Sequence, residues 1–148
     1  YAIGLSCNRD SAIATRSDIC ITPVVGPEVV SGSTRMKAGT ATKMVLNILT
    51  TGAMIRLGKT YGNLMVDLRA TNTKLADRAR RIVRAVTNLT DNESDRLLKD
   101  SGGEVKTAIV RHYTGYSPTE ARELLSASHG HLKTALQGRL NHNNASSH

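Results

Sequence analysis

The strongest constraint on the fold is a pair of short apolar runs near the N-terminus. Residues 2–7 and 19–25 each have the length and composition of a buried strand. Between them, Asp10 or Ser11 can cap a short helix over residues 12–17. This order predicts parallel strands in a sheet covered by helices. Two strands alone do not make a stable sheet. We therefore expect the C-terminal part of a larger α/β domain, or a partner chain that supplies the other strands.

The composition is that of a globular protein. Of the 148 residues, 39% are hydrophobic and 22% are charged, and the net charge is +8. This balance does not suit a disordered chain. No apolar run reaches 18 residues, so we expect no membrane partner. Cys7 and Cys20 are too few for a disulfide framework and fit reduced thiols in a cytoplasmic protein.

A loop rich in hydroxyl and basic side chains, residues 26–40, leads from the second strand into a long helix. Apolar residues at helical spacing carry that helix to about Leu57, with Gly58 as its C-cap. Ligands of open parallel sheets bind beyond the carboxyl ends of the strands. A helix N-terminus there offers free N–H groups and partial positive charge. The pattern predicts a site for a phosphorylated, hydroxyl-rich ligand. The expected contacts are Glu28, Ser31, Ser33, Thr34, Arg35 and Lys37.

The same loop also has a purely structural interpretation. Ser33 or Thr34 can simply cap the helix, since Ser and Thr are common caps, and Arg35 and Lys37 can be solvated. Glu28 adds a carboxylate that can take a proton, but a proton-transfer role depends first on geometry. The residue types alone leave both interpretations open.

The loop reads Gly-Pro-Glu-Val-Val-Ser-Gly-Ser-Thr-Arg-Met-Lys-Ala-Gly-Thr, and Tyr-Gly-Asn-Leu-Met-Val-Asp follows at residues 61–67. Together with Lys43 and Asn47, these residues resemble the N-acetylmuramic acid 6-phosphate etherases, which are sugar isomerase (SIS) domain proteins. The related glucokinase regulatory protein carries a similar loop. The resemblance runs from about residue 2 to about residue 136 and covers the second half of the family's usual length. It implies that residues 1–68 are the C-terminal part of an SIS phosphosugar-binding domain.

The resemblance also implies an activity. Enzymes of this family are carbon–oxygen lyases of cytoplasmic peptidoglycan recycling. They cleave the lactyl ether of N-acetylmuramic acid 6-phosphate by elimination and water addition, giving N-acetylglucosamine 6-phosphate and D-lactate. Two glutamates carry the acid/base work, and both are expected upstream of this chain. The resemblance therefore assigns no catalytic residue here, and it implies a substrate contact for Glu28.

The expected partners follow from the same resemblance. They are a phosphorylated amino sugar and a second copy of the protein in a homodimer, without nucleic acid or membrane. No metal or organic cofactor is implied, because acid/base chemistry on an open-chain aldehyde suffices. The alternative is a non-catalytic phosphosugar-binding regulatory protein of the SIS family.

Residues 69–88 are predicted to form a basic connecting helix, capped by Thr71 or Thr73. Six basic residues and a single acid, Asp77, lie between Arg69 and Arg84. A nucleic-acid-binding helix is one interpretation of this charge. Because no aromatic or base-reading pattern accompanies it, we favour a solvated face or a contact with acidic residues of a neighbouring subunit.

Residues 89–137 contain an internal repeat at an offset of 27 residues, in which residues 93–109 match residues 120–136. Each copy has a Leu-Leu pair, a glycine turn and a Lys-Thr-Ala run. Two helix–turn–helix hairpins are predicted, packed as a small all-α, ubiquitin-associated-like bundle. Residues 138–148 are expected to form a disordered tail.

The repeat also predicts where its helices begin and which side chains they bury. Each copy opens with a capping box, formed by Thr90 and Glu93 or by Ser117 and Glu120, and Pro118 stands at a first helical position. The expected core residues are Leu97, Leu98, Val105, Ala108, Ile109, Leu124, Leu125, Leu132, Ala135 and Leu136.

Overall fold

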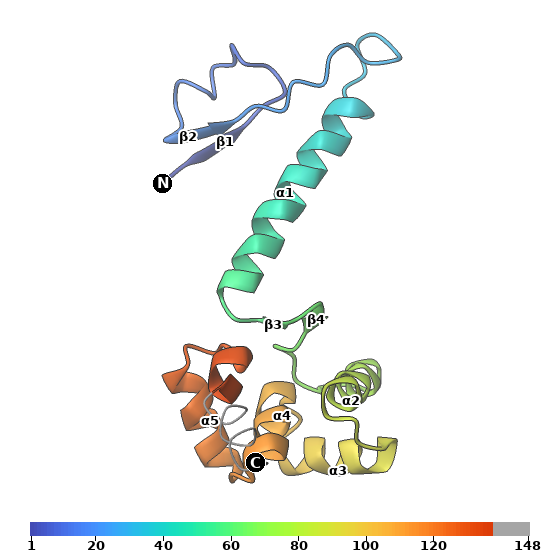
Figure 1. Cartoon of the computed structure of the whole chain (residues 1–148). Helices are drawn as coiled ribbons and strands as arrows, with labels where there is room; N and C mark the ends of the chain where they lie inside the picture. The colour runs from blue at the N-terminus through green and yellow to red at the C-terminus, as the bar shows by residue number, and fades with distance from the viewer. Residues whose placement is uncertain (138–148) are drawn as a thin grey trace, which may run out of the picture. The chain divides into compact units, whose positions relative to one another are not determined.

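The computed structural model describes residues 1–137, and the predicted tail at residues 138–148 lies outside that range. The chain divides into two compact units, Tyr1–Ala53 and Met54–His148, which are described one at a time. In the described residues, a pair of short strands precedes a long helix, a second pair follows it, and further helices come after, so the chain is α/β with a small parallel sheet (Figure 1). Within residues 1–137, no helix has both the length and the apolar character that a membrane span requires.

The first unit contains the predicted parallel pair of strands. β1 (Ile3–Leu5) and β2 (Ile19–Ile21) lie side by side in parallel, with Ile3 opposite Ile19. Both of these isoleucine side chains are 53% exposed. The two strands therefore pair as the sequence predicted, but they leave apolar surface open.

The helix predicted between these strands does not form. Residues 12–17 are a succession of turns, in which Ala14 donates to the Ser11 carbonyl at 3.0 Å and Arg16 donates to the Ile13 carbonyl at 3.3 Å. Two hydroxyl groups in this stretch also donate back to nearby carbonyls. Six residues are too few to offset helix nucleation, and hydroxyls compete for the backbone, which explains why the helix prediction was wrong.

The long helix is present as α1 (Lys37–Arg56). Its C-terminal end is closed by Gly58, which has φ 67° and donates to the Ile55 carbonyl at 3.0 Å, as predicted. None of its residues is buried by the part of the chain that the structure describes. A helix that is apolar around much of its circumference is usually covered on several sides. Its most exposed apolar residues are Met44, Leu46, Ile48, Leu49, Met54 and Ile55.

The second unit begins with a small hairpin and a helix. β3 (Thr60–Tyr61) and β4 (Leu64–Met65) pair antiparallel. α2 (Thr73–Thr87) follows. Its cap is Asn72, whose side-chain oxygen accepts the Leu75 amide at 2.9 Å, so the prediction of a threonine cap was wrong. Three adjacent polar residues all suit a cap, and Asn72, with extended backbone, stands directly before the first helical residue.

The repeat forms α3 (Asp91–Asp100), α4 (Val105–Thr114), α5 (Pro118–Ala127) and a further helical stretch at residues 132–137. Both predicted capping boxes are present. The two turns also match at the level of the backbone. Gly103 donates to the Leu98 carbonyl at 2.8 Å, and its counterpart Gly130 donates to the Leu125 carbonyl at 2.7 Å. The duplication in sequence is therefore a duplication in structure.

The core of the second unit holds eight of the ten predicted residues, all but Leu97 and Leu124. Those two are half-buried, whereas the next residues, Leu98 and Leu125, are only 5% and 7% exposed. Consecutive helical residues point about 100° apart, so only one leucine of each pair can reach the centre. The complete set of buried apolar residues is Val66, Ala79, Ile82, Val83, Leu98, Val105, Ala108, Ile109, Val110, Ala121, Leu125, Leu132, Ala135 and Leu136.

A linker at residues 58–70 precedes α2, and the two turns of the repeat hold its two ends. At the first turn, Ala70 donates to the Gly103 carbonyl at 3.0 Å. At the second, Gly58 lies so close to Gly130 that an added Cβ would approach the Gly130 carbonyl oxygen to 3.0 Å. Between these points, Asp67 forms ion pairs with Lys59 and Lys106 at 3.0 and 2.9 Å. The linker is thereby fixed to the helices.

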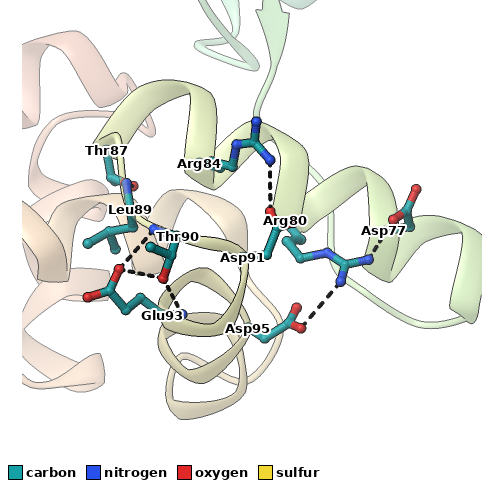
Figure 2. Close-up of polar contacts among 9 residues, drawn as sticks. All are labelled: Asp77, Arg80, Arg84, Thr87, Leu89, Thr90, Asp91, Glu93 and Asp95. Carbon is teal, nitrogen blue, oxygen red and sulfur yellow. Dashed lines mark hydrogen bonds and ion pairs between the residues drawn. The ribbon is translucent and has the colours of Figure 1, made fainter.

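Three arginines of α2 pair with acids of the same chain: Arg80, Arg81 and Arg84. Figure 2 shows the pairs of Arg80 and Arg84. Arg80 contacts Asp77 at 2.6 Å and Asp95 at 3.5 Å. Arg84 contacts Asp91 of α3 at 3.0 Å. The pairs with Asp95 and Asp91 join α2 to α3, and acidic residues of a neighbouring subunit are not needed for them.

Candidate functional site

A cleft lies in the first unit beyond the carboxyl ends of the parallel strands. One wall is the segment that follows β1, and the other is the start of α1 with the loop before it. Open parallel sheets place their ligands at this edge, because loops and helix N-termini meet there. The lining residues are Leu5, Ser6, Cys7, Asn8, Val25, Gly26, Glu28, Thr34, Ala38, Gly39 and Thr42.

The loop of residues 26–36 has its conformation set by local turns. Gly26 and Gly32 have φ values of 70° and 85°, which favour glycine. The Ser33 amide donates to the Val30 carbonyl at 3.2 Å and closes a turn. The Gly39 amide donates to the Thr34 carbonyl at 3.0 Å and ties the loop to α1.

Glu28 occupies the N-terminus of α1. One carboxylate oxygen accepts the Lys37 amide at 2.9 Å, and the other accepts the Ala38 amide at 3.1 Å. The Lys37 ammonium group donates to the Pro27 carbonyl at 2.9 Å. The hydrogen bonds from the backbone amides of Lys37 and then Ala38 hold the pKa of Glu28 below its ordinary value. Two of the N–H groups that the sequence offered to a ligand are therefore bonded to this side chain.

Of the six residues named from the sequence, Glu28 and Thr34 line this cleft. Arg35 and Lys37 line a neighbouring, mainly apolar concavity that includes Met36 and Met44. Ser31 is exposed and Ser33 is half-buried, and neither lines either hollow. Contact of these six residues with a ligand stays a prediction.

Polar residues that the sequence did not single out also line the cleft. Ser6, Cys7 and Asn8 follow β1, and Thr42 lies one turn into α1. The Cys7 sulfur is 3.8 Å from the Ala38 carbonyl and 4.0 Å from the Thr42 hydroxyl. Their position directly after a strand was the signal that could have identified the first three.

The cleft can bind a polar ligand but has few groups for proton transfer. Glu28 is the only carboxylate among its lining residues. In the described part of the chain, no three His, Cys, Asp or Glu side chains come together in a way that could hold a metal ion. The chemistry available here is hydrogen bonding from hydroxyl, amide and backbone groups.

A second hollow lies in the second unit and is lined by Asp67, Arg69, Glu104 and Lys106 among apolar residues. Its acids are already engaged: Asp67 pairs with Lys106, and Glu104 pairs with Arg122 at 2.8 Å. These contacts hold the linker and the helices together, so we assign this hollow a structural role.

Comparison with known proteins shows which proteins this chain is similar to in sequence. No protein-family model matches the chain. The chain is 61% identical over 109 residues to the N-acetylmuramic acid 6-phosphate etherase of Rhodopirellula baltica, covering 74% of this chain and 36% of that protein. This chain resembles the N-acetylmuramic acid 6-phosphate etherases.

Other proteins named as such etherases match similarly. That of Streptomyces avermitilis is 61% identical over 107 residues, covering 72% of this chain and 34% of the relative. That of Pasteurella multocida is 56% identical over 107 residues, covering 72% and 36%. The chain thus spans about a third of the length of the curated relatives it matches. The resemblance predicted from residues 26–40 and 61–67 is confirmed.

Proposed function

We propose that this chain is the C-terminal part of an N-acetylmuramic acid 6-phosphate etherase, a carbon–oxygen lyase. The observation that carries the proposal is the 56–61% identity, over about three-quarters of this chain, to proteins with that name. Those names favour the lyase over a non-catalytic phosphosugar-binding regulatory protein. A cytoplasmic location belongs to the proposal and fits the unpaired thiols of Cys7 and Cys20.

The proposal includes a finer assignment of the fold. Residues 1–68 would be the C-terminal part of an SIS domain, and residues 69–88 would connect it to a ubiquitin-associated-like bundle at residues 89–137. The parallel pairing of β1 and β2 beside a long helix supports the first assignment. The duplicated helix–turn–helix structure supports the second.

In the proposed reaction, a base takes the proton from the carbon next to the open-chain aldehyde. The ether bond on the following carbon breaks, and its electron pair leaves with the lactyl oxygen, which an acid protonates to release D-lactate. Water then adds across the new double bond and gives N-acetylglucosamine 6-phosphate. The acid and the base would be glutamates outside this chain. Residues here would hold the phosphosugar, and we assign that role to Glu28, Ser31, Ser33, Thr34, Arg35 and Lys37.

A homodimer is also part of the proposal. The apolar residues of α1 are exposed when the described chain is considered alone, which fits a helix that other parts of the complete protein or a second copy would cover. The phosphorylated amino sugar would be the only small-molecule partner, and neither nucleic acid nor a membrane is proposed.

The reaction is tested with the complete protein and N-acetylmuramic acid 6-phosphate in water enriched in ¹⁸O. Elimination followed by water addition should place ¹⁸O on the sugar carbon that carried the lactyl ether, besides any label that the aldehyde oxygen exchanges with water, and none in the newly formed hydroxyl of lactate. Label in lactate instead would indicate cleavage on the other side of the ether oxygen. Binding of the phosphosugar without any lactate release would favour the regulatory alternative.

The role of the loop is tested by Thr34→Val, which removes a hydroxyl group from the cleft but keeps the side-chain shape. If the hydroxyl contacts a charged phosphosugar group, binding should weaken by about tenfold to a hundredfold. Ser33→Ala should behave in the same way if Ser33 reaches the ligand in the complete protein. The matched control is Thr119→Val on α5, an exposed position outside the cleft. Unchanged binding in both loop variants would remove the loop from the site.

A further inference from the structure

We infer that Glu28 is a positioning residue, whose carboxylate holds the loop of residues 26–36 against the first turn of α1 and so shapes the cleft. This inference narrows the general substrate-contact role proposed above. Its kinetic test rests on the proposed etherase function, whereas its structural test does not.

The geometry of the carboxylate is that of a helix cap supplied from a distance. Its two oxygens accept separate amides, those of Lys37 at 2.9 Å and Ala38 at 3.1 Å. These amides belong to the first turn of α1, where N–H groups have no partner within the helix. Nine and ten residues separate Glu28 from its partners, so the two bonds close the loop onto the helix.

A third bond closes the same loop from the opposite direction. The Lys37 ammonium group donates to the Pro27 carbonyl at 2.9 Å. The Glu28 side chain therefore accepts from the Lys37 backbone, and the Lys37 side chain donates to the backbone of Pro27, next to Glu28. Because Glu28, Ala38 and Gly39 all line the cleft, this closure sets the shape of its wall.

Engagement of both oxygens argues against proton transfer by Glu28. A general base needs an oxygen directed at the proton it removes, and a general acid needs a proton of its own. Here both oxygens already accept amide hydrogens, and these bonds favour the ionised form. The negative charge at the start of a helix is favourable in addition, because of the helix dipole.

Two other glutamates of the chain also accept backbone amides at helix starts. Glu93 and Glu120 accept the amides of Thr90 and Ser117, each at 2.8 Å, at the starts of α3 and α5. Hydrogen bonds from the cap residues lower the pKa of both carboxyl groups as well. These two glutamates lie outside the cleft, so they separate the general effect of removing a cap carboxylate from an effect on the site.

The kinetic experiment compares Glu28→Gln and Glu28→Ala in the complete protein, with Glu120→Gln as the control. D-lactate release from N-acetylmuramic acid 6-phosphate is followed across a range of pH. For Glu28→Gln we expect KM to rise by about tenfold and kcat to fall by less than about threefold, the pattern of lost binding geometry. The rise in KM should be larger for Glu28→Ala than for Glu28→Gln, because the side-chain oxygen of glutamine can still accept one of the two backbone amides. The control, Glu120→Gln, should have the KM and kcat of the wild type.

The opposite role gives a different result. A fall in kcat of about a hundredfold or more in both variants, together with loss of one limb of the pH profile, would make Glu28 an acid/base catalyst and overturn the inference. Wild-type kinetics in both variants would also overturn it, because the loop would then not need this contact.

The structural experiment follows the amide NMR signals of Lys37 and Ala38 in the complete wild-type protein as the pH is lowered. Both signals should titrate together, with a midpoint below the ordinary glutamate pKa, and the titration should disappear in Glu28→Gln. Absence of a shared titration in the wild type would overturn the inference. If the wild type releases no lactate, the etherase proposal fails, and this titration still decides whether Glu28 holds the loop.

Discussion

Residues 1–53 and residues 54–137 contain the same kinds of apolar side chain, but these side chains have different surroundings. In the second unit they form a continuous core from Val66 to Leu136. In the first unit, Gly4 is the only residue buried by the described part of the chain. Ile3, Ile19 and Ile48 remain between 53% and 67% exposed.

The difference shows that, among the described residues, the second unit buries an apolar core and the first does not. The second unit packs its helices and its linker around one core, and polar contacts hold the linker. The first unit has two three-residue strands and a helix in which no residue is fully buried by the described part of the chain. Helical stability in proteins comes mostly from such packing. The cleft that we propose for the phosphosugar therefore lies in the unit with the less extensive packing, which fits our proposal that further chain completes this unit.

The largest expected effect comes from the core of the second unit. Leu98→Ala should lower the free energy of unfolding by about 2–5 kcal/mol, since Leu98 is 5% exposed and its removal leaves a cavity. Ile48→Ala in the first unit, at a residue that is 67% exposed, should change it by less than about 0.5 kcal/mol. Urea denaturation of residues 1–148 measures both. Equal effects would show that α1 is packed as firmly as α3.

The next effect comes from the contact between the linker and the second turn of the repeat. Gly58→Ala should destabilise by about 1–3 kcal/mol, because the residue has φ 67° and its Cβ would meet Gly130 at 3.0 Å. Gly115→Ala is the matched control, with φ 73° and no atom within 4 Å of the added Cβ. It reports the cost of the backbone conformation alone. Equal losses in the two variants would mean that the close approach of Gly58 to Gly130 contributes nothing.

A smaller effect concerns acid pH. Burial raises the pKa of Asp67, but hydrogen bonds and charges from Lys106 and Lys59 outweigh burial and hold the pKa below its ordinary value. A lowered pKa in the folded state adds stability above the ordinary value, near pH 4, and this stability is lost as the pH falls through the folded value. Since Asp67 is partly exposed, we expect Asp67→Asn to cost about 0.5–1 kcal/mol at pH 6 and less at pH 3.

Glu28→Gln sharpens this comparison, because its carboxylate also has a lowered pKa but lies in the first unit. It should leave the unfolding transition of the second unit unchanged at both pH values. Denaturation curves at pH 6 and pH 3 make the measurement. A loss with Glu28→Gln as large as that with Asp67→Asn would show that the two units unfold together.

The smallest effect comes from a difference between the copies of the repeat. The Ser94 hydroxyl is buried and has no hydrogen-bond partner among the described residues, and its counterpart in the second copy is Ala121. Ser94→Ala should therefore be neutral or stabilising by up to about 0.5 kcal/mol. The control is Ser101→Ala, which removes a hydroxyl that donates to the Leu97 carbonyl at 2.6 Å and should destabilise. A clear loss of stability in Ser94→Ala would point to a partner for this hydroxyl.

Local signals made the helices of the repeat predictable. A capping box spans only four residues, so Thr90 with Glu93 and Ser117 with Glu120 could be recognised in the sequence, as could the turn glycines. The choice between Leu97 and Leu98 depends on where neighbouring helices pack, and a repeat alone does not contain that information.

The sequence predicted the loop that forms one wall of the cleft but not the contacts within that wall, and ligand binding there stays a prediction. Placement after a strand and before a helix identified the loop, and Glu28 and Thr34 do line the cleft. The bond from Glu28 to residues nine and ten positions later depends on the fold of the loop. The same holds for the approach of Cys7 to Thr42, which joins segments 35 residues apart.

Amide hydrogen exchange on residues 1–148 tests most directly whether only the second unit is stably packed. We predict that amides in α4 exchange close to the rate set by global unfolding, whereas those in residues 37–53 of α1 and in β1 exchange at least about a hundredfold faster. Equal protection of α1 and α4 would contradict the account, because residues 1–53 would then form a stable unit without further chain.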